Sequence, residues 1–337
     1  MFSALKSNGV HAIRTSLDSD DKSIDFARRA YAMGIKIDWI AELKFRPGAP
    51  RRSHEEQQTY HVWDNAPLSW ADPDAFRAYA APIFEKLDQA GVVLAGIELW
   101  NEFNSAGFNG DFELPGEGRV LNLDDLHHDK EGQQIAQGYL QYLKILAVLK
   151  DVRDHSRLNQ HSPIISGGLT LGREEGPNPD MKKMRIDGVS ANATLQFLKA
   201  NGLNSLVDAY GVHVYPWDDG PGLPGPANAR RSRLDKFNLS ECGAASRGGR
   251  PCWITEWGFK YKTQSCPPPD ETDHVTLVRE MMSDFHSYVA AGRLTGLFYF
   301  AWNTDPWQKA VGGPWSVYRC NGPTQSGLQA VDANLLH

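Results

Sequence analysis

The feature that most constrains the fold is a regular alternation of strand-like and helix-like segments along the chain. Each short apolar run is followed by a longer amphipathic stretch, and this pairing occurs seven times. The predicted strands are residues 9–17, 35–43, 92–100, 163–169, 206–215, 251–256 and 294–302. The predicted helices are residues 20–33, 69–90, 131–157, 189–201, 229–239, 272–291 and 327–336. Such alternation is typical of a parallel sheet whose strands are joined through helices.

The connections that follow the strands are much longer than those that precede them. They are residues 44–68, 103–130, 170–188, 216–228, 260–271 and 303–326. In a (β/α)8 barrel, the carboxyl ends of the strands and the loops after them build the active site, so this asymmetry favours a barrel. A barrel takes about 250 residues plus insertions, and the chain has 337 residues, of which 41% are hydrophobic. We therefore expect an α/β fold of the (β/α)8 TIM-barrel type, with residues 1–337 as one catalytic domain.

Two predicted strands end in a carboxylate flanked by aromatic side chains. The first carries Glu102 after Trp100 and before Phe103, and the other carries Glu256 before Trp257. Either glutamate alone would be an ordinary strand-end carboxylate. An aromatic wall raises the pKa of a general acid by disfavouring its charged form. Cleavage of a glycosidic bond uses such a pair of carboxyl groups, one as the acid and the other as nucleophile or base.

These segments also match known motifs. Trp100-Asn101-Glu102-Phe103-Asn104 resembles the W-N-E-P-N signature of clan A glycoside hydrolases, and Trp253-Ile254-Thr255-Glu256-Trp257-Gly258 resembles the strand-seven motif of that clan. The resemblance implies that Glu102 is the acid/base and Glu256 the nucleophile. The order and the spacing of the two motifs agree with the clan, over roughly residues 4–335.

Weaker matches suggest substrate-binding residues. Arg14 stands where the clan often has a strand-two arginine, His213 and Tyr215 resemble its strand-six H-x-Y segment, and Trp302 matches the aromatic residue that ends strand eight. Asn101 would bond the sugar 2-hydroxyl, and Trp302 would form the floor under the sugar. Each has a structural alternative: a salt bridge for Arg14, a buried core histidine for His213, a loop-closing amide for Asn101 and barrel-top packing for Trp302.

The motifs also depart from the clan. Phe103 replaces the usual proline, and the predicted strand 35–43 lacks the histidine usual in family 5, which favours family 39 or another clan A lineage. The expected activity is that of a retaining glycoside hydrolase acting by double displacement on an oligosaccharide or polysaccharide, without metal or cofactor. A carbohydrate-binding barrel without activity and a metal-dependent barrel hydrolase remain alternatives. Residues 124–125 and 127–129, which are aspartates and histidines, are expected to form a solvated loop.

Other classes of partner fit the composition poorly. The net charge is −6 without a basic stripe, which disfavours nucleic acid. No run of 18 apolar residues suggests a membrane span. Ten tryptophans offer flat apolar platforms, and the candidates for outer sugar subsites are Trp217, Trp257, Trp307 and Trp315.

The four cysteines form no C-x-x-C motif. Cys266 and Cys320 follow neighbouring strands on the same face of the expected barrel, and Cys242 and Cys252 lie ten residues apart at its other end. Either pair could be bridged, and four free thiols are the alternative. Disulfides would suit a secreted or periplasmic enzyme, although the chain opens without a signal-peptide apolar region.

The strand count predicts a missing element. Numbered by the clan motifs, the seven strands are strands two to eight, and residues 2–9 are then the end of the first helix. We expect a first strand, and most of that helix, to precede Met1 in the natural protein, since a barrel without one strand has two free edges.

Overall fold

The computed structural model describes residues 1–170, 179–215, 239–261, 265–302 and 315–336. The chain folds as two compact units, each made of segments that are not continuous in the sequence. We call residues 14–32 and 36–211 the first unit, and residues 1–13, 33–35 and 212–337 the second unit.

The first unit is built on a sheet with the strand order β1-β2-β3-β5. Its strands are β1 (Ala12–Ser16), β2 (Lys36–Ala41), β3 (Gly96–Asn101) and β5 (Ile164–Gly168). β2 and β5 both pair with β3 in parallel register. A parallel bridge between Ile165 and Ala209 continues the sheet to the residues that open β7 (Tyr210–Val214). The parallel sheet that the alternating pattern predicts is therefore present.

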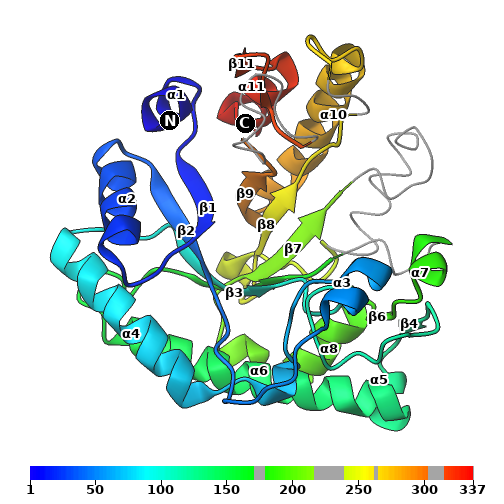
Figure 1. Cartoon of the computed structure of the whole chain (residues 1–337). Helices are drawn as coiled ribbons and strands as arrows, with labels where there is room; N and C mark the ends of the chain where they lie inside the picture. The colour runs from blue at the N-terminus through cyan, green and yellow to red at the C-terminus, as the bar shows by residue number, and fades with distance from the viewer. Residues whose placement is uncertain (171–178, 216–238, 262–264, 303–314, 337) are drawn as a thin grey trace. The chain divides into compact units, whose positions relative to one another are not determined.

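Four helices follow one another along this sheet (Figure 1). They are α2 (Asp21–Ala32), α4 (Pro73–Ala90), α6 (Lys130–Asp154) and α8 (Ala191–Ala200). The starts of three of them are set by side chains that accept hydrogen bonds from free backbone N–H groups. Asp72 caps α4, with proline at the first helical position, and Asp129 and Ser190 cap α6 and α8. α4 ends where Gly91 adopts a left-handed φ of 73°.

Short elements occupy the connections. They are α3 (His54–Tyr60), the 3-10 helices η1 (Leu68–Trp70) and η2 (Leu203–Ser205), β4 (Val120–Leu121), α5 (Asp125–His128), α7 (Pro179–Met184) and β6 (Gly188–Val189). The polar composition around α3 had favoured a loop there. α3 begins with a capping box. The Glu56 backbone N–H donates to the Ser53 side chain, and the Ser53 backbone N–H donates to the Glu56 side chain.

The two faces of the sheet in the first unit differ in chemistry. Trp39 of β2 is fully buried and meets Phe84 of α4 edge-on, with ring centroids 5.4 Å apart. Because side chains alternate along a strand, Asp38 points to the opposite face. The register pairs Asp38 with Gly96 and Ile40 with Glu98, so Glu98 shares that face. One face thus packs apolar side chains on helices, while the other carries two buried carboxyl groups.

The second unit contains the sheet β7-β8-β9. β8 (Cys252–Trp257) and β9 (Leu294–Tyr299) are parallel. The other elements among its described residues are α1 (Phe2–Ser7), η5 (Ala245–Arg247), α10 (Glu271–Ala290), β10 (Tyr318–Arg319), β11 (Gly322–Pro323), α11 (Gln325–Ala330) and η6 (Ala333–Leu336). Trp257 is fully buried against Phe285 of α10 and Tyr299 of β9.

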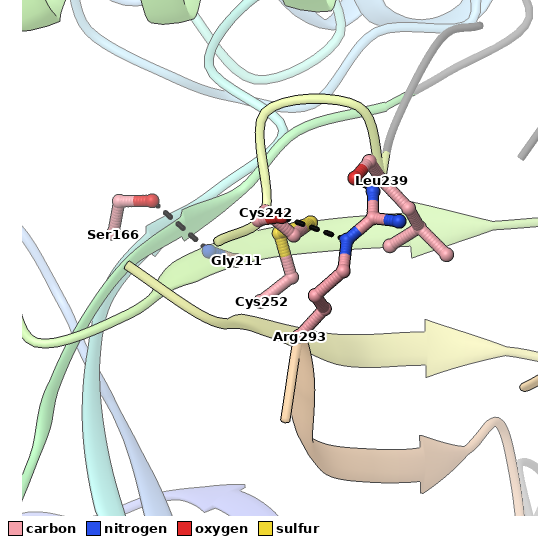
Figure 2. Close-up of a disulfide and its surroundings, with 6 residues drawn as sticks. All are labelled: Ser166, Gly211, Leu239, Cys242, Cys252 and Arg293. Carbon is pink, nitrogen blue, oxygen red and sulfur yellow. Dashed lines mark hydrogen bonds between the residues drawn. A yellow bond between two sulfur atoms is a disulfide. The ribbon is translucent and has the colours of Figure 1, made fainter. Parts of the chain in front are cut away.

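Both candidate cysteine pairs are bridged. Cys242 and Cys252 have Cα atoms 5.3 Å apart, and Cys266 and Cys320 have Cα atoms 5.5 Å apart. Figure 2 shows the first bridge, with the Arg293 guanidinium beside it. Arg293 donates to the Cys242 carbonyl at 2.9 Å and also to the Leu239 carbonyl. The bridge and the arginine together fix the segment that leads into β8.

The seven predicted strands are all found, most of them shorter than predicted. The predicted strand 92–100 begins only at Gly96, and Leu94 before it donates its N–H to the Asn159 side chain. The predicted helix 229–239 falls almost wholly outside the described residues. A strand before Met1 stays a prediction. No helix in the described part of the chain is long and apolar enough to cross a membrane.

Candidate active-site residues

In the second unit, Glu256 lies near the carboxyl end of β8 with two polar neighbours. The Tyr215 hydroxyl donates a hydrogen bond of 2.5 Å to Glu256 Oε2. His213 Nδ1 lies 3.5 Å from the same oxygen, and the histidine is fully buried. A hydroxyl that donates to a carboxylate stabilises its negative charge and fixes its orientation. This unit therefore brings together three of the predicted site residues, with Tyr215 and His213 beside the Glu256 carboxylate.

Aromatic side chains hold Tyr215 in this position. Its ring meets Trp315 edge-on, with centroids 5.1 Å apart, and Phe300 at 6.5 Å. Trp315, which the sequence suggested as an outer subsite, thus contacts the tyrosine that bonds Glu256. Trp302 lies in the same unit with its ring 5.6 Å from that of Tyr318, and its carbonyl accepts from the Tyr318 N–H.

In the first unit, Glu102 follows directly after the last residue of β3. Its backbone has a φ of 39°, and that of Trp100 a φ of 69°. The left-handed region costs a non-glycine residue about 1–3 kcal/mol. Hydrogen bonds hold the turn: Glu102 N–H donates to the Gly168 carbonyl at 2.8 Å, and its carbonyl accepts from Ser105 at 3.0 Å. Strain of this kind, fixed by surrounding bonds, is characteristic of positions that aim a functional side chain.

Arg14 joins Asn101 to a buried carboxylate. Arg14 Nε lies 2.5 Å from Glu98 Oε2, and Arg14 Nη2 donates to Asn101 Oδ1 at 3.0 Å. Glu98 Oε1 accepts from the Gly168 N–H at 2.7 Å. In an uninterrupted strand, residues 98 and 101 would face opposite sides. The left-handed Trp100 breaks the alternation, so both side chains reach the same guanidinium.

Asp38 adds a second buried carboxyl group, which was not among the predicted site residues. It is fully buried, and neither of its oxygens has a hydrogen-bond partner. Burial, and next the charge of Glu98, raise the pKa of Asp38 well above its usual range, while Arg14 opposes them. In the sequence, the signal for this buried carboxyl group was a charged residue within the apolar run Ile37-Asp38-Trp39. One cation and two carboxyl groups thus lie beneath Asn101.

Several expectations about individual residues are corrected. Phe103 forms no wall around Glu102: it is fully buried, with its ring stacked on Tyr142 of α6 at 4.4 Å. Trp257 is a core residue and not an outer sugar subsite, since it is fully buried. Trp217 and Trp307 lie outside the described residues. Of the expected solvated loop, residues 125–128 form α5, and Asp129 both caps α6 and pairs with Arg119.

No family model matches this sequence, and no curated protein does either. Solved structures do resemble the chain. One is a family 39 β-xylosidase from Caulobacter crescentus, with 16% identity and a TM-score of 0.55 over 99% of this chain and 66% of that protein. Another is an endo-1,4-β-xylanase from Caldicellulosiruptor owensensis, with 12% identity and a TM-score of 0.51 over 96% of this chain and 89% of that one.

Fungal β-1,4-galactanases are similar as well, with 16% identity and a TM-score of 0.51 over 97% of this chain and 89% of the galactanase. At such identities the likeness bears on the fold alone: these proteins are α/β barrels, and the parallel sheets of this chain are consistent with that fold. It spans only 66% of the length of the xylosidase. The solved structures that this chain resembles are thus clan A glycoside hydrolases, the group that its two glutamate motifs also resemble.

Proposed function

We propose that this chain is a retaining glycoside hydrolase, with Glu256 as the nucleophile and Glu102 as the acid/base. The observation that carries the proposal is the environment of Glu256, which accepts from Tyr215 and lies beside buried His213 near the carboxyl end of β8. Glu102 supports it, because it follows β3 on a strained turn that hydrogen bonds hold in place. The two strands would belong to one closed (β/α)8 barrel, as in the resembled hydrolases.

The reaction would take two displacements. First, a Glu256 oxygen attacks the anomeric carbon while Glu102 donates its proton to the leaving oxygen, which gives a covalent glycosyl-enzyme ester. Glu102, now ionised, then takes a proton from water, and the resulting hydroxyl displaces Glu256 from the anomeric carbon. For this chemistry the two carboxyl groups must come within about 5–5.5 Å of each other.

The remaining residues have supporting roles in this proposal. Tyr215 stabilises the charge of Glu256 before attack and after release. Asn101, oriented by Arg14, would bond the sugar 2-hydroxyl, a contact that strengthens in the transition state. Trp302 would lie under the sugar ring. The substrate class is a β-linked oligosaccharide or polysaccharide, such as the xylan and galactan on which resembled enzymes act.

A panel of 4-nitrophenyl β-glycosides tests the proposal, with xyloside, galactoside, mannoside and glucoside as members. We expect turnover of at least one, and NMR of fresh product should show the anomer of the substrate, because two displacements restore the configuration. An inverted product at early times would refute the double displacement. Lack of hydrolysis on this panel and on the corresponding polysaccharides would contradict the proposed hydrolase activity on these sugars and favour a carbohydrate-binding barrel.

Two variants separate the roles of the glutamates. Glu256→Ala should abolish turnover of every glycoside, and added azide should restore product of the opposite anomeric configuration. Glu102→Ala should lower kcat/KM, which reports the first displacement, by about 10²–10⁴-fold for poor leaving groups and much less for 4-nitrophenolate, which departs without protonation. Equal losses on good and poor leaving groups would remove Glu102 from the acid role.

A further inference from the structure

Trp63 is an exposed indole on a loop of the first unit, between α3 and η1. Its exposed fraction is 65%, whereas its neighbour Val62 is 5% exposed. A single exposed apolar residue needs no special explanation. Trp63 has a second feature, since the Phe108 ring lies beside it with centroids 6.4 Å apart and planes tilted by 40°. We call Trp63 and Phe108 the Trp63 platform.

The backbone under the platform is firmly held. Trp63 N–H donates to the Gly107 carbonyl at 3.2 Å, and the Asn65 side-chain amide donates to the same carbonyl at 2.9 Å. Gly110 N–H donates to the Ala66 carbonyl at 3.2 Å, and a Cβ on Gly110 would lie 2.6 Å from Ala66 backbone carbon. The two loops are therefore packed backbone against backbone. A large apolar ring on such a support loses little conformational entropy when a ligand binds.

Contacts link the Trp63 platform to the neighbourhood of Glu102, the proposed acid/base. The Phe108 carbonyl accepts from Trp100 Nε1 at 3.1 Å, and Trp100 lies two residues before Glu102. Phe45 meets the Trp100 ring edge-on at 6.1 Å, with the Arg51 guanidinium 5.4 Å from the Phe45 ring centre. Contacts thus connect Trp100, near the end of β3, through the Phe108 backbone to the Trp63 platform, all within the first unit.

We propose that the Trp63 platform is a sugar-binding subsite, which takes a ring of the glycan chain remote from the bond that is cleaved. This inference rests on the proposed function. A pyranose has a face of C–H groups that packs on an aromatic ring and an edge of hydroxyls that needs polar partners. Beside the platform, Asp64 and Arg51 are exposed, and Arg51 Nη1 bonds the Asp64 carbonyl at 3.1 Å. Flat rings bordered by exposed polar groups match both parts of a sugar.

The platform also predicts what kind of substrate is favoured. A ring bound at Trp63 contributes only if the chain is long enough to reach from Glu102 past Trp100 and Phe108. The enzyme should therefore prefer long oligosaccharides and polysaccharides to aryl monosaccharides. With a net charge of −6, the chain is ill suited to nucleic acid, whose bases also stack on aromatic rings.

The first test measures binding without turnover. In the Glu256→Ala background, migration in native gels that contain xylan, galactan or glucomannan reports affinity for each polysaccharide. Trp63→Ala should weaken binding to the preferred polysaccharide about tenfold, and Trp63→Phe should restore most of it. Trp70→Ala is the matched control, because Trp70 is another exposed tryptophan of the same unit, at 38%. Equal migration of the Trp63→Ala and Trp70→Ala proteins would overturn the inference.

The second test uses chain length. With oligosaccharides of two to six residues of the sugar that the glycoside panel selects, the ratio of kcat/KM for the longest to the shortest should fall about tenfold in Trp63→Ala. It should keep its wild-type value in Trp70→Ala, with equal melting temperatures. An unchanged ratio in Trp63→Ala would refute the subsite. If the wild type binds polysaccharide through Trp63 yet cleaves nothing, the subsite is supported and the proposed hydrolase function fails.

Discussion

At the scale of single residues, Arg14, Asp38 and Glu98 form a cluster of ionisable side chains in the first unit. All three side chains are buried or nearly so, and one guanidinium faces two carboxyl groups. A buried pair of like charges is costly, and one bound proton removes that repulsion. Burial and the charge of Glu98 raise the pKa of Asp38, so we expect this proton on Asp38. In this arrangement the Asp38 carboxyl group is protonated, and it can ionise if Glu98 is removed.

This arrangement predicts non-additive mutations. Asp38→Asn should be mild, because it replaces a neutral carboxyl group by a neutral amide. Glu98→Gln should cost less than the loss of a buried partner normally does, since Asp38 no longer faces a negative charge and can ionise beside Arg14. The double variant leaves Arg14 without either carboxylate. Its loss in unfolding free energy should exceed the sum of the single losses by about 0.5–3 kcal/mol, as measured by urea denaturation. If the losses of the two single variants simply add up to that of the double variant, Asp38 does not ionise to replace Glu98.

Glu131, at the start of α6, predicts a pH dependence of stability. Burial, followed by the charge of Asp187, raises the pKa of Glu131 to about 7, against the hydrogen bonds from the Glu113 N–H and Arg119. The unfolded pKa is about 4.3. Between these two values the folded state binds more protons than the unfolded state, so stability falls as pH rises from about 4.3 to about 7. Above pH 7 this contribution is constant.

Glu131→Gln tests that reasoning, because glutamine has no proton to lose. The free energy of unfolding of the variant, relative to wild type, should rise between pH 4.5 and 7 and then level off. Glu113→Gln is a suitable control, since Glu113 is exposed and lies beside Glu131. If the difference between Glu131→Gln and wild type does not change with pH, the proton is not held at this carboxyl group.

At the scale of secondary-structure elements, two disulfides fix loops around β8 in the second unit. Cys266–Cys320 spans 54 residues, and Cys242–Cys252 spans 10. A longer closed loop removes more entropy from the unfolded chain, by about 4 kcal/mol for 54 residues and about 3 kcal/mol for 10 in the chain-entropy model. Arg293 also holds the shorter loop by two hydrogen bonds. The double variant Cys266→Ser/Cys320→Ser should therefore lose more stability than Cys242→Ser/Cys252→Ser in thermal melts. The opposite order would show that native-state packing outweighs loop entropy here.

The elements also show what the sequence can and cannot predict. Long apolar runs identified the seven strands, and Pro73 and Gly91 marked the ends of α4, because their signals are local. The capping box of Ser53 and Glu56 was a readable start for α3 that the loop-like composition obscured. The meeting of Arg14 with Glu98 and Asn101 was not readable, since it depends on strand order and, for Asn101, on the left-handed turn at Trp100. Sequence motifs thus predict candidate site residues, but strand order and register determine which of their side chains come into contact.

At the scale of the whole molecule, the division into two units follows neither the order of the chain nor the boundaries of its strands. β1 begins in the second unit, at Ala12, and ends in the first unit, at Ser16. β7 begins in the first unit, at Tyr210, and ends in the second unit, at Val214. An ordinary boundary between domains falls in an exposed linker, whereas these boundaries cut through strands.

Shared strands predict cooperative unfolding. If one unit melted alone, the chain would have to unfold from the middle of β1 and from the middle of β7. We expect one calorimetric transition, with equal calorimetric and van't Hoff enthalpies, and the same midpoint by tryptophan fluorescence and far-UV circular dichroism. The measurement should be made with both disulfides intact, because reduction would add a second process. Two resolved transitions, or a protease-resistant fragment covering only residues 36–211, would show that the units are separate domains and would contradict a single catalytic domain over residues 1–337.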